Sequence, residues 1–576
     1  MELEKRWVIQ PTIPEDVEQN LREYPPLLRQ LLYNRHIEDK QSAHDYLYSK
    51  GALYNPFRLK NMERAVTRIK TAIHNQEPII VYGDYDVDGI TATALLVQVL
   101  RKLGARVDKH IPNRFEEGYG LTLETLAELK ERGAKLIITV DCGIRSPREV
   151  AAAVEMGMQV IISDHHAPHD LIPDAYAIIN PKQPEDEYPE KNLAGVGVAY
   201  KIAEALSIRM REFKVDVRDW LDFVAIGTIA DIVPLTGENR SMAKAGLELL
   251  RQGKRSGLNA LAGAAKLDIH KVTARDIGFV IGPRLNAAGR LESAAKAYEI
   301  LATDDLTYAG LLAQELDDQN RTRQEETQRI QQEAETQIEQ DAAKEFLLFA
   351  VDPAYSLGIV GLAAAKLVEK YYRPAIVGGS QECLGQEEYN YAQNGGFIRA
   401  SCRSIPEFHI TRALDQCKDL FERHGGHEMA AGFTIRCDRL EELRRRMRDI
   451  ARQELEPLDL RPTLFADKEI ALDRNWGGVF DLLDSLEPYG MANPEALFAS
   501  RNMEVMSCWQ VGKDKSHLRL KLKSGNVTYD GIAFRQGYWF DKGIKKIDIL
   551  YSFERNFYND RETMQLNIRD IREAAT

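Results

Sequence analysis

Val81-Tyr82-Gly83-Asp84-Tyr85-Asp86-Val87-Asp88-Gly89-Ile90 is the stretch of this chain that decides its fold. The apolar run that leads into it, Pro78 to Val81, predicts a short buried strand. Behind it, apolar residues recur on one helical face from Ala92 to Leu103, which predicts a helix. Three acids therefore follow the carboxyl end of a strand just before a helix, and open α/β sheets bind ligands at that place.

Asp84, Asp86 and Asp88 repel one another, and nothing about a fold requires them. A divalent cation would remove the repulsion, because carboxylates are ligands of hard cations. A plain polar loop tip is the alternative, since Asp and Gly are common in turns. The pattern D-x-D-x-D-G also opens an EF-hand calcium loop. We reject the calcium loop, because it needs a preceding helix and a Glu at its twelfth position, where this chain has Leu95.

The composition is that of a soluble globular protein, with 44% hydrophobic and 28% charged residues. The length of 576 residues allows roughly three or four domains. The net charge of −12 argues against a protein that coats nucleic acid through bulk charge, but it leaves room for a local basic groove. The six cysteines form no CxxC pair, the start lacks a signal peptide, and no run is apolar enough to span a bilayer. We expect a cytoplasmic monomer that does not associate with membranes.

Strands and helices alternate from Pro78 to Pro181. Strands are predicted at residues 78–83, 106–111, 135–140, 159–163 and 175–179. This alternation predicts a mainly parallel, doubly wound sheet, so the fold class is α/β. The helix after the third strand has clear end signals. Ser146 and Glu149 fit a capping box, Pro147 fits the first helical position, and Gly157 ends the helix.

More acids and histidines follow the later strands. Asp141 follows the third strand, and Asp164-His165-His166 follows the fourth. Asp231 comes after another apolar stretch, and we place it at the same sheet edge. A lone Asp at a strand end is more often a cap than a ligand, but paired histidines among so many acids favour a metal site. Oxygen and imidazole ligands without a thiolate suit manganese or magnesium better than zinc.

Taken together, these motifs resemble the DHH phosphoesterase superfamily. They are G-D-Y-D-V-D-G at 83–89, V-D-C-G at 140–143, D-H-H at 164–166 and A-D at 230–231. Within the superfamily the chain is similar to the bacterial enzymes that degrade single-stranded DNA from 5′ to 3′. It shares with them N-R at 113–114, E-G-Y-G at 117–120 and G-P-R-L-N-A-A-G-R at 282–290. The combination covers most of the chain and is highly specific, whereas D-x-D-x-D-G alone is not.

The resemblance implies a cofactor of two ions, Mn²⁺ or Mg²⁺, bridged by Asp141. One ion would lie near Asp86 and Asp141, with help from Asp84. The ligands implied for the other ion are Asp88, Asp141, His165 and Asp231.

The resemblance also implies roles in catalysis and substrate binding. His166 would contact the scissile phosphate, and Asp164 would orient a histidine. Arg114, Ser401 and Arg403 would surround the terminal 5′-phosphate. The remaining substrate contacts that it implies are Arg284, Asn286, Arg290 and His427.

The middle of the chain predicts a connector and a second α/β unit. Residues 305–340 are polar, charged and almost free of Gly and Pro, which predicts one long exposed helix. The motif S-C-R-S at 401–404 resembles a family motif that has Gly where this chain has Cys402. The run G-G-H-E-M-A-A-G at 425–432 resembles the motif of the DHH-associated domain, and its glycines let backbone N–H groups approach a phosphate. A tight turn explains the same glycines equally well.

The last part of the chain is predicted to be a β-barrel. His517 to Lys523 alternates apolar and mostly basic residues, and aromatic residues cluster after Phe534. Basic strand faces beside aromatic rings are typical of an OB-fold that binds single strands, although a small barrel core uses several of the rings. Residues 487–494 resemble the family segment that introduces this domain, with Ala492 where the family has Gly.

The predicted organisation has five parts: an N-terminal helical segment (1–76), the DHH catalytic domain (77–304), a connector helix (305–344), the DHH-associated domain that binds phosphate or DNA (345–458) and an OB-fold domain (459–576). The function expected from the resemblance is a metal-dependent 5′-to-3′ exonuclease that releases 5′-mononucleotides from single-stranded DNA in repair and recombination. A single-strand-binding protein and a RecQ-type helicase are the implied protein partners.

Two alternatives come from the same superfamily. Enzymes for very small substrates, such as oligoribonucleases and cyclic-dinucleotide phosphodiesterases, are shorter, lack an OB domain and have a His where this chain has Tyr82. A non-enzymatic DNA-binding relative, like the DHH subunit of the eukaryotic replicative helicase, would lose metal ligands that this sequence keeps.

Overall fold

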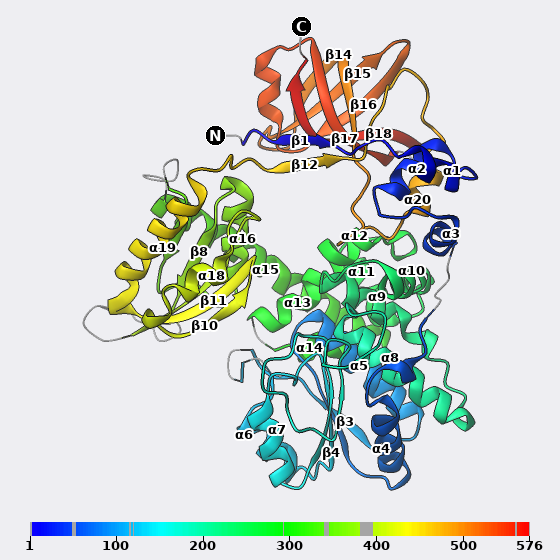
Figure 1. Cartoon of the computed structure of the whole chain (residues 1–576), viewed down its shortest axis with the longest axis vertical. Coiled ribbons are helices and arrows are strands. Elements are labelled where there is room, and N and C mark those ends of the chain that lie inside the picture. The colour runs from blue at the N-terminus through cyan, green and yellow to red at the C-terminus, as the bar shows by residue number, and fades with distance from the viewer. Residues whose placement is uncertain are drawn as a thin grey trace. The chain divides into compact units, whose positions relative to one another are not determined.

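The structure, a computed structural model, describes residues 3–48, 53–114, 117–118, 120–291, 293–338, 345–380, 396–558 and 561–574. Tyr119 of the E-G-Y-G motif and the last part of the predicted connector, 339–344, lie outside these ranges. The chain divides into two compact units (Figure 1). The larger unit comprises residues 7–289, 293–314 and 464–576, and the smaller unit comprises residues 1–6, 290–292 and 315–463.

A five-stranded parallel sheet forms the centre of the larger unit. Its strands are β2 (Ile79–Tyr82), β3 (Val107–His110), β4 (Leu136–Val140), β5 (Gln159–Ser163) and β6 (Ala177–Ile179), in the order β3-β2-β4-β5-β6. All four pairings are parallel, so the predicted doubly wound α/β fold is confirmed. The chain reverses its direction across the sheet between β2 and β4, which is the place where such sheets bind ligands.

Helices cover both faces of this sheet (Figure 1). On one face, α6 (Leu123–Glu131) and α7 (Pro147–Glu155) pack on a core that contains Ile80, Tyr82 and Ile137. On the other face lie α4 (Met62–His74), α5 (Val87–Lys102) and α8 (Gly195–Arg209). Helix α5 is buried on nearly every side, because α8, α9 (Leu221–Ala230) and α14 (Ala295–Ala302) also pack on it. The helix behind the opening acids is therefore fixed in position.

The predicted ends of α7 are correct only in part. Pro147 is its first residue, and Gly157, with φ +77°, ends it as predicted. The capping box was wrong, because the Ser146 side chain makes no cap hydrogen bond. The backbone of Ser146 (φ −117°, ψ 52°) lies outside the extended conformation that the box requires.

The remaining helices of the larger unit build its outer layers. They are α1 (Glu15–Asn20), α2 (Pro26–Tyr33), α3 (Lys40–Tyr48), α10 (Gly237–Leu250), α11 (Ser256–Ala264), α12 (Ala274–Asp276) and α13 (Gly282–Leu291). Shorter turns are η1 (Pro56–Arg58), η2 (Arg211–Phe213), η3 (Val217–Trp220), η4 (Ile269–Lys271), η8 (Gly537–Lys542) and the π-helix η5 (Ile277–Ile281).

A closed barrel forms the C-terminal part of the larger unit. Its strands are β14 (Phe498–Val511), β15 (His517–Ser524), β16 (Val527–Ala533), β17 (Lys546–Tyr558) and β18 (Arg561–Glu573). Pairing of β14 with β17 closes the barrel, as the predicted OB-fold requires. The alternation predicted for β15 is confirmed, because Leu518, Leu520 and Leu522 are buried while Arg519 and Lys521 are exposed.

The N-terminal segment packs on the barrel, and it is helical except for one strand. Leu21, Leu31 and Leu32 share one hydrophobic core with Phe498 and Tyr551. Strand β1 (Arg6–Ile9) pairs with β12 (Thr463–Ala466), and the short β13 (Lys468–Glu469) pairs with β14. Helix α20 (Val479–Ser485) adds Val479 and Leu483 to the same core.

The smaller unit is a second α/β body. Helix α15 (Leu306–Ile338) runs unbroken for 33 residues, so the long helix is confirmed as far as Ile338. It leads to a five-stranded sheet in the order β10-β11-β9-β8-β7. Its elements are β7 (Leu348–Val351), α16 (Val360–Tyr371), β8 (Ala375–Gly379), β9 (Phe397–Arg403), α18 (Ile410–Asp415), η6 (Lys418–Leu420), β10 (Phe421–His427), β11 (Ala430–Arg436), η7 (Cys437–Arg439) and α19 (Leu440–Leu455).

Among the described residues, no helix is long and apolar enough to cross a membrane.

Candidate metal centre

The opening acids lie in the turn between β2 and α5. Asp86 is the N-cap of α5, and its Oδ1 accepts hydrogen bonds from the backbone N–H groups of Asp88 (2.9 Å) and Gly89 (3.1 Å). This cap gives Asp86 a structural role, since an Asp N-cap satisfies N–H groups that the helix leaves unpaired. Asp84 and Asp88 are buried on either side of it.

Asp88 is held by the N-terminus of another helix. The N–H of Gly195 donates to Asp88 Oδ2 at 2.6 Å, and the N–H of Val196 donates to Oδ1 at 2.8 Å. Both residues belong to the first turn of α8, where the helix dipole favours a negative charge. A Cβ atom on Gly195 would lie 2.6 Å from Asp141 Cβ, so only glycine lets α8 approach both acids.

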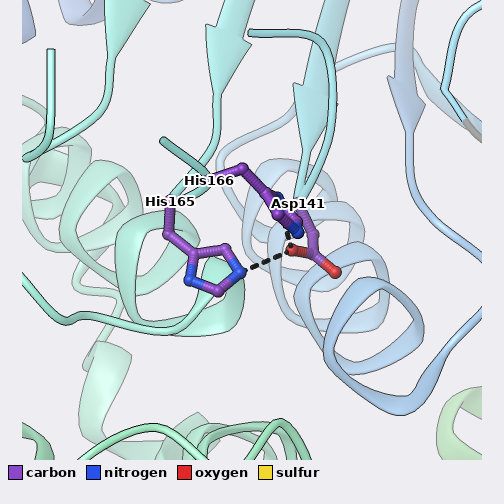
Figure 2. A group of neighbouring side chains, drawn as sticks. All are labelled: Asp141, His165 and His166. Carbon is purple, nitrogen blue, oxygen red and sulfur yellow. Dashed lines mark ion pairs between the residues drawn. The ribbon is translucent and has the colours of Figure 1, made fainter. Parts of the chain in front are cut away.

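Asp141 lies at the carboxyl end of β4 in a left-handed backbone conformation, with φ +63°. Figure 2 shows the two histidines after β5 pointing toward its carboxylate. His165 Nε2 lies 3.1 Å from Asp141 Oδ1, and His166 Nδ1 lies 3.9 Å from the same atom. His165 Nε2 is also 3.6 Å from Asp231 Oδ2 and 3.8 Å from Asp88 Oδ2. Asp141 and His165 are therefore the centre of the cluster.

Three sets of side chains could each hold a metal ion, with ligand atoms within 4.8 Å of one another. The sets are Asp84 with Asp86 and Asp141, Asp88 with His165 and Asp231, and Asp141 with His165 and His166. The structure thus brings together all six residues predicted as metal ligands. Asp141 occurs in two of the sets. The first set matches the ligands expected for one ion, and the second contains the ligands expected for the other ion except Asp141.

Asp231 reaches the cluster from a helix and not from a strand. It is the C-cap of α9, so the prediction that it follows a strand was wrong, although it does lie beside His165 in the predicted cluster. The apolar stretch before it is a buried helix segment, and a short apolar run does not distinguish a buried strand from a buried helix.

Asp164 orients both histidines. Its Oδ1 accepts hydrogen bonds from the backbone N–H groups of His165 (2.7 Å) and His166 (3.0 Å) and lies 2.8 Å from His166 Nδ1, while its Oδ2 accepts from the N–H of Ile144 (3.0 Å). Burial alone would raise the pKa of Asp164, but these hydrogen bonds and the charge of His166 lower it below its usual value. Asp164 is therefore an ionised anchor beside acids that resist ionisation.

The carboxylates of the cluster favour their protonated forms when no cation is bound. Burial, and then the neighbouring acids, raise the pKa of Asp88 to about 7 and that of Asp231 to about 9. The same causes raise the pKa values of Asp84 and Asp141 well above the usual value. Burial lowers the pKa of His165 to about 3, so its ring stays neutral.

The cluster fits bound divalent cations. Within the part of the chain that the structure describes, Asp84 Oδ1 is buried and has no hydrogen-bond partner. Native proteins rarely bury such an atom without a partner. The donor set is oxygen and neutral imidazole without a thiolate, which suits Mn²⁺ or Mg²⁺.

Two predicted substrate contacts of the larger unit, Arg114 and Asn286, lie beside this cluster, and a third, Arg284, lies on the same helix as Asn286. The Arg114 guanidinium lies 5.1 Å from the ring centre of Tyr85, and its charge acts on Asp84. Asn286 Oδ1 accepts a hydrogen bond from the N–H of Val87 at 3.2 Å, so this side chain braces the acid-bearing turn. Arg284 donates to the carbonyl of Val280 at 2.9 Å.

Several supporting residues were not predicted from the sequence. Glu117 accepts hydrogen bonds from the N–H of Asn113 (2.7 Å) and the hydroxyl of Thr125 (2.6 Å), which fixes the loop that carries Arg114. The buried Tyr82 hydroxyl donates to the carbonyl of Gly120 in the same loop at 2.9 Å. The G-V-G run of Gly195 gave a usable signal, because glycines opening a helix often mark N–H groups that bind anions.

The smaller unit places Ser401 and Arg403 on one face of β9, at the N-terminus of α16. A Cβ atom on Gly361, in the first turn of α16, would lie 3.0 Å from Arg403 Nη2 and 3.3 Å from Ser401 Oγ. A hydroxyl, a guanidinium and helix N–H groups thus meet at a glycine, a combination that suits a phosphate. We call this group the β9 anion face.

Cys402 leaves the β9 anion face unobstructed. Side chains alternate along a strand, so Cys402 points to the opposite face, where it is fully buried in a hydrophobic core. Burial raises the pKa of its thiol to about 12. Where the family motif has glycine, this chain therefore has a cysteine whose side chain packs in the core.

Arg290 and His427 have structural contacts in the same unit. Arg290 donates to the carbonyl of Gly358 at 3.2 Å, just before α16. His427 is the last residue of β10 and pairs with Ala430, so the glycine-rich run forms the hairpin of β10 and β11. Its carbonyl accepts a hydrogen bond from the Thr411 hydroxyl at 2.7 Å.

Models of three protein families match the chain. They are the DHH family N-terminal domain over residues 78–228, the DHHA1 domain over 344–453 and the RecJ OB domain over 466–570. The single-stranded-DNA-specific exonuclease RecJ of Salmonella typhimurium is 36% identical over 95% of this chain, which covers 96% of that protein. The chain belongs to the RecJ family.

Other RecJ proteins agree with this assignment. RecJ of Bacillus subtilis is 38% identical over 95% of this chain and 68% of its own length. The crystal structure of RecJ from Thermus thermophilus in complex with Mn²⁺ matches with a TM-score of 0.83 and 28% identity, over 99% of this chain and 80% of that one. A crystal structure of exonuclease RecJ bound to manganese matches with a TM-score of 0.59 and 33% identity, over 70% of this chain and 98% of that one.

Proposed function

We propose that this chain is a metal-dependent exonuclease that degrades single-stranded DNA from 5′ to 3′ and releases 5′-mononucleotides, in DNA repair and recombination. The observation that carries the proposal is the carboxylate and histidine cluster in which Asp141 belongs to two ligand sets. In a chain of the RecJ family, such a cluster supports a phosphodiester hydrolase with two metal ions.

The proposed cofactor is a pair of Mn²⁺ or Mg²⁺ ions, the ions named for the RecJ structures of Thermus thermophilus. Asp84, Asp86 and Asp141 would hold one ion, and Asp88, His165 and Asp231 would hold the other. Asp141, whose Oδ1 lies 3.1 Å from His165 Nε2, is proposed to serve both ions. When bound, the ions would polarise a phosphodiester and lower the pKa of a water molecule.

The remaining side chains of the centre position the substrate. His166 is partly exposed, and its Nδ1 faces Asp164 at 2.8 Å, which turns its Nε2 away from Asp164. This ring is proposed to contact the scissile phosphate. Asp164 fixes the tautomer and direction of that ring. Gly195 and Val196 hold Asp88 in place, so α8 keeps the acids at a fixed separation.

Cationic groups are proposed to recognise the strand and its 5′ end. In the larger unit, Arg114 is held by a loop that Glu117 and Tyr82 brace, and Arg284 and Asn286 lie on α13. In the smaller unit, the β9 anion face would bind the terminal phosphate, and Arg290 and His427 would contact the strand. We propose the five domain boundaries given above for this division of labour.

The barrel is proposed to bind single-stranded DNA farther from the cut. Trp509 and Phe534 are 40% and 50% exposed, which is unusual for such large rings. The Arg519 guanidinium lies 5.7 Å from the Trp509 ring centre, and His517 packs edge-on against Phe534. Exposed rings beside cations give bases a surface for stacking and phosphates a countercharge. We propose a cytoplasmic monomer that works with a single-strand-binding protein and a RecQ-type helicase.

The test compares four substrates: a single strand labelled at its 5′ end, the same strand labelled at its 3′ end, a blunt duplex and a dinucleotide. Each is incubated with the full chain and Mn²⁺, with and without EDTA. We expect metal-dependent release of the 5′ label first, little cleavage of the duplex and slow cleavage of the dinucleotide. Release of the 3′ label first, or a strong preference for the dinucleotide, would overturn the proposal.

A further inference from the structure

Phe279 is the most exposed large hydrophobic side chain among the described residues, with 77% of its surface accessible. It lies in the middle of η5, a π-helix over Ile277–Ile281. π-Helical turns are uncommon and often occur at functional sites, because the extra residue moves a side chain out of its regular position. A single exposed hydrophobic side chain is normal on a protein surface, so the exposure of Phe279 indicates a contact only together with its irregular turn and its neighbours.

Ile232 is a second apolar residue in an unusual state. It is 63% exposed, and its φ of +60° places it in the left-handed region. A β-branched residue is strained in that conformation, and glycine would be free of the strain. Both its exposure and its backbone therefore disfavour isoleucine, which indicates that the side chain is kept for a contact.

Ile232 and the turn that carries Phe279 both lie at the end of α9 that bears Asp231, a proposed metal ligand. Ile232 follows it directly, at the end of α9. The turn that carries Phe279 packs on the same helix end: a Cβ atom on Gly278 would lie 4.0 Å from Ile229 Cγ2, and one on Gly282 would lie 3.6 Å from Ala230 Cβ. We call Phe279 and Ile232 the apolar ledge, and all of it lies in the larger unit.

We propose that the apolar ledge contacts bases of the single-stranded DNA whose phosphate is cleaved at the metal centre. This inference rests on the proposed function and adds a base-contacting site to it. The choice of occupant follows from position, since a strand that presents a phosphate to Asp231 must place neighbouring bases beside this residue. Aromatic and aliphatic surfaces bind bases of any sequence by stacking, which suits an exonuclease that must process every sequence.

A cation on the turn that carries Phe279 agrees with this occupant. Arg284 donates to the carbonyl of Val280, the residue after Phe279, at 2.9 Å. The guanidinium is thereby held on the same turn as the ring. An arginine beside an exposed ring is the pairing that single-strand-binding proteins use, with the backbone phosphate on the cation and the base on the ring. A hydrophobic protein partner would gain nothing from the arginine.

The test measures cleavage of 5′-phosphorylated single strands in which one nucleotide at a time, from the first to the sixth, is replaced by an abasic residue. The wild-type chain and Phe279→Ala are compared with Mn²⁺. We expect the wild type to lose about tenfold in kcat/KM when the base that meets the ledge is absent, which is within the range for one stacked base. Phe279→Ala should show the same loss on the intact strand and no further loss at that abasic position.

Phe213→Ala is the matched control. Phe213 is also a partly exposed phenylalanine (42%), but it contacts Gly104 just beyond the C-terminal end of α5, whereas the acids lie at the N-terminal end of that helix. This control should cleave every strand like the wild type. An equal melting temperature for all three proteins will show that Phe279→Ala is folded.

Ile232→Gly gives an independent readout. Removal of the strained side chain should raise the melting temperature by about 1–3 °C, while KM for single-stranded DNA rises several-fold. A rise in stability together with weaker substrate binding is the pattern of a residue kept for function and not for folding.

The possible outcomes distinguish failure of the base-contact proposal from failure of the proposed exonuclease function. A wild type that cleaves no single strand contradicts the proposed function and, with it, the ledge. A wild type that cleaves the intact strand, with Phe279→Ala at the same rate or equally sensitive to every abasic position, overturns the ledge alone. If Phe279→Ala cleaved more slowly than the wild type only after a partner protein is added, Phe279 would be assigned to that partner. This result would also overturn the proposed base contact.

Discussion

The metal centre and the β9 anion face are built for opposite charges. At the centre, buried acids lie so close together that the pKa values of Asp88 and Asp231 rise to about 7 and about 9. At the β9 anion face, a serine and an arginine meet a helix N-terminus beside Gly361. The acids need an added cation before they can all ionise, whereas the β9 anion face already has its positive charge.

The difference shows how one chain can treat two phosphates differently. A phosphate that reaches the acids depends on metal ions to offset repulsion, so chemistry there depends on metal concentration and pH. A phosphate on the proposed β9 anion face would be bound by fixed groups of the protein, so binding there would depend on geometry and salt. Four predictions test this contrast, from the largest expected effect to the smallest.

Removal of the shared acid should have the largest effect. We expect Asp141→Ala and Asp141→Asn to lower the cleavage rate by about 1,000-fold or more, because one side chain serves two ligand sets. Asn tolerates the φ of +63° at this position better than Ala does, so it separates the lost charge from backbone strain. Binding of single-stranded DNA, measured by fluorescence anisotropy, should persist in both. Asp170→Asn is the control, because Asp170 is an exposed residue of the loop after β5. Cleavage by Asp141→Asn near the wild-type rate would show that Asp141 does not serve both ligand sets.

Removal of the Arg403 guanidinium should slow cleavage of 5′-phosphorylated strands only. We expect Arg403→Ala to lower kcat/KM on 5′-phosphorylated single strands by about 10- to 100-fold, the usual range for a hydrogen-bonded charge. On strands with a 5′-hydroxyl the variant and the wild type should be alike. Arg445→Ala is the control, because Arg445 lies on the exposed side of α19 and pairs with Glu442. Equal losses on both substrates would contradict a role in binding the terminal phosphate.

Metal binding should stabilise the protein more at higher pH. The pKa of an aspartate in the unfolded chain is 3.8, below the folded values of about 7 for Asp88 and about 9 for Asp231. Between these pH values the folded chain keeps protons on the two side chains that the unfolded chain has released. Without metal, stability should therefore fall as the pH rises from about 4, through about 7 for Asp88, to about 9 for Asp231. Mn²⁺ should offset this loss, so its effect on the melting temperature should be several degrees at pH 8 and smaller at pH 5.

Scanning calorimetry in EDTA and in Mn²⁺ at both pH values provides the measurement. An Asp141→Asn sample should gain less from Mn²⁺ at pH 8 than the wild type does. A shift in melting temperature that is the same at pH 5 and pH 8 would contradict the proton-linked account of the metal centre.

Restoring the family glycine at Cys402 should have the smallest effect on activity. The Cys402 side chain is buried in the core on the far side of β9, so Cys402→Gly removes packing and leaves the β9 anion face unchanged. We expect KM for 5′-phosphorylated DNA to stay within about twofold, while the free energy of unfolding falls by about 1–2 kcal/mol. Cys402→Ala should lie between the two proteins in stability. Tighter binding of 5′-phosphorylated DNA by Cys402→Gly would show that the cysteine does restrict the β9 anion face.

The strand ends and the spacing of the acids that follow them could be predicted from the sequence, because each strand end is set by residues close to it in the chain. Apolar runs and glycines delimit strands within a few residues, and each predicted strand of the parallel sheet overlaps an observed one. The carboxyl ends of parallel strands share one sheet edge, so Asp86, Asp141 and His165 could be expected together before any coordinates. The alternation in β15 and the long α15 were predicted in the same way.

The sequence by itself therefore determined the α/β class, the acids and histidines that the fold brings into one cluster, and the barrel at the end. Tertiary structure decided how those acids are held: Asp231 arrives from a helix, α8 presents two N–H groups to Asp88, and Cys402 turns into the core. It also decided that Ala492 keeps the turn with φ +59° that the family fills with glycine. The physical reason is the distance along the sequence between the residues that interact. Hydrogen bonding within a few residues follows from composition and spacing, whereas contacts between distant segments depend on which faces the whole fold brings together.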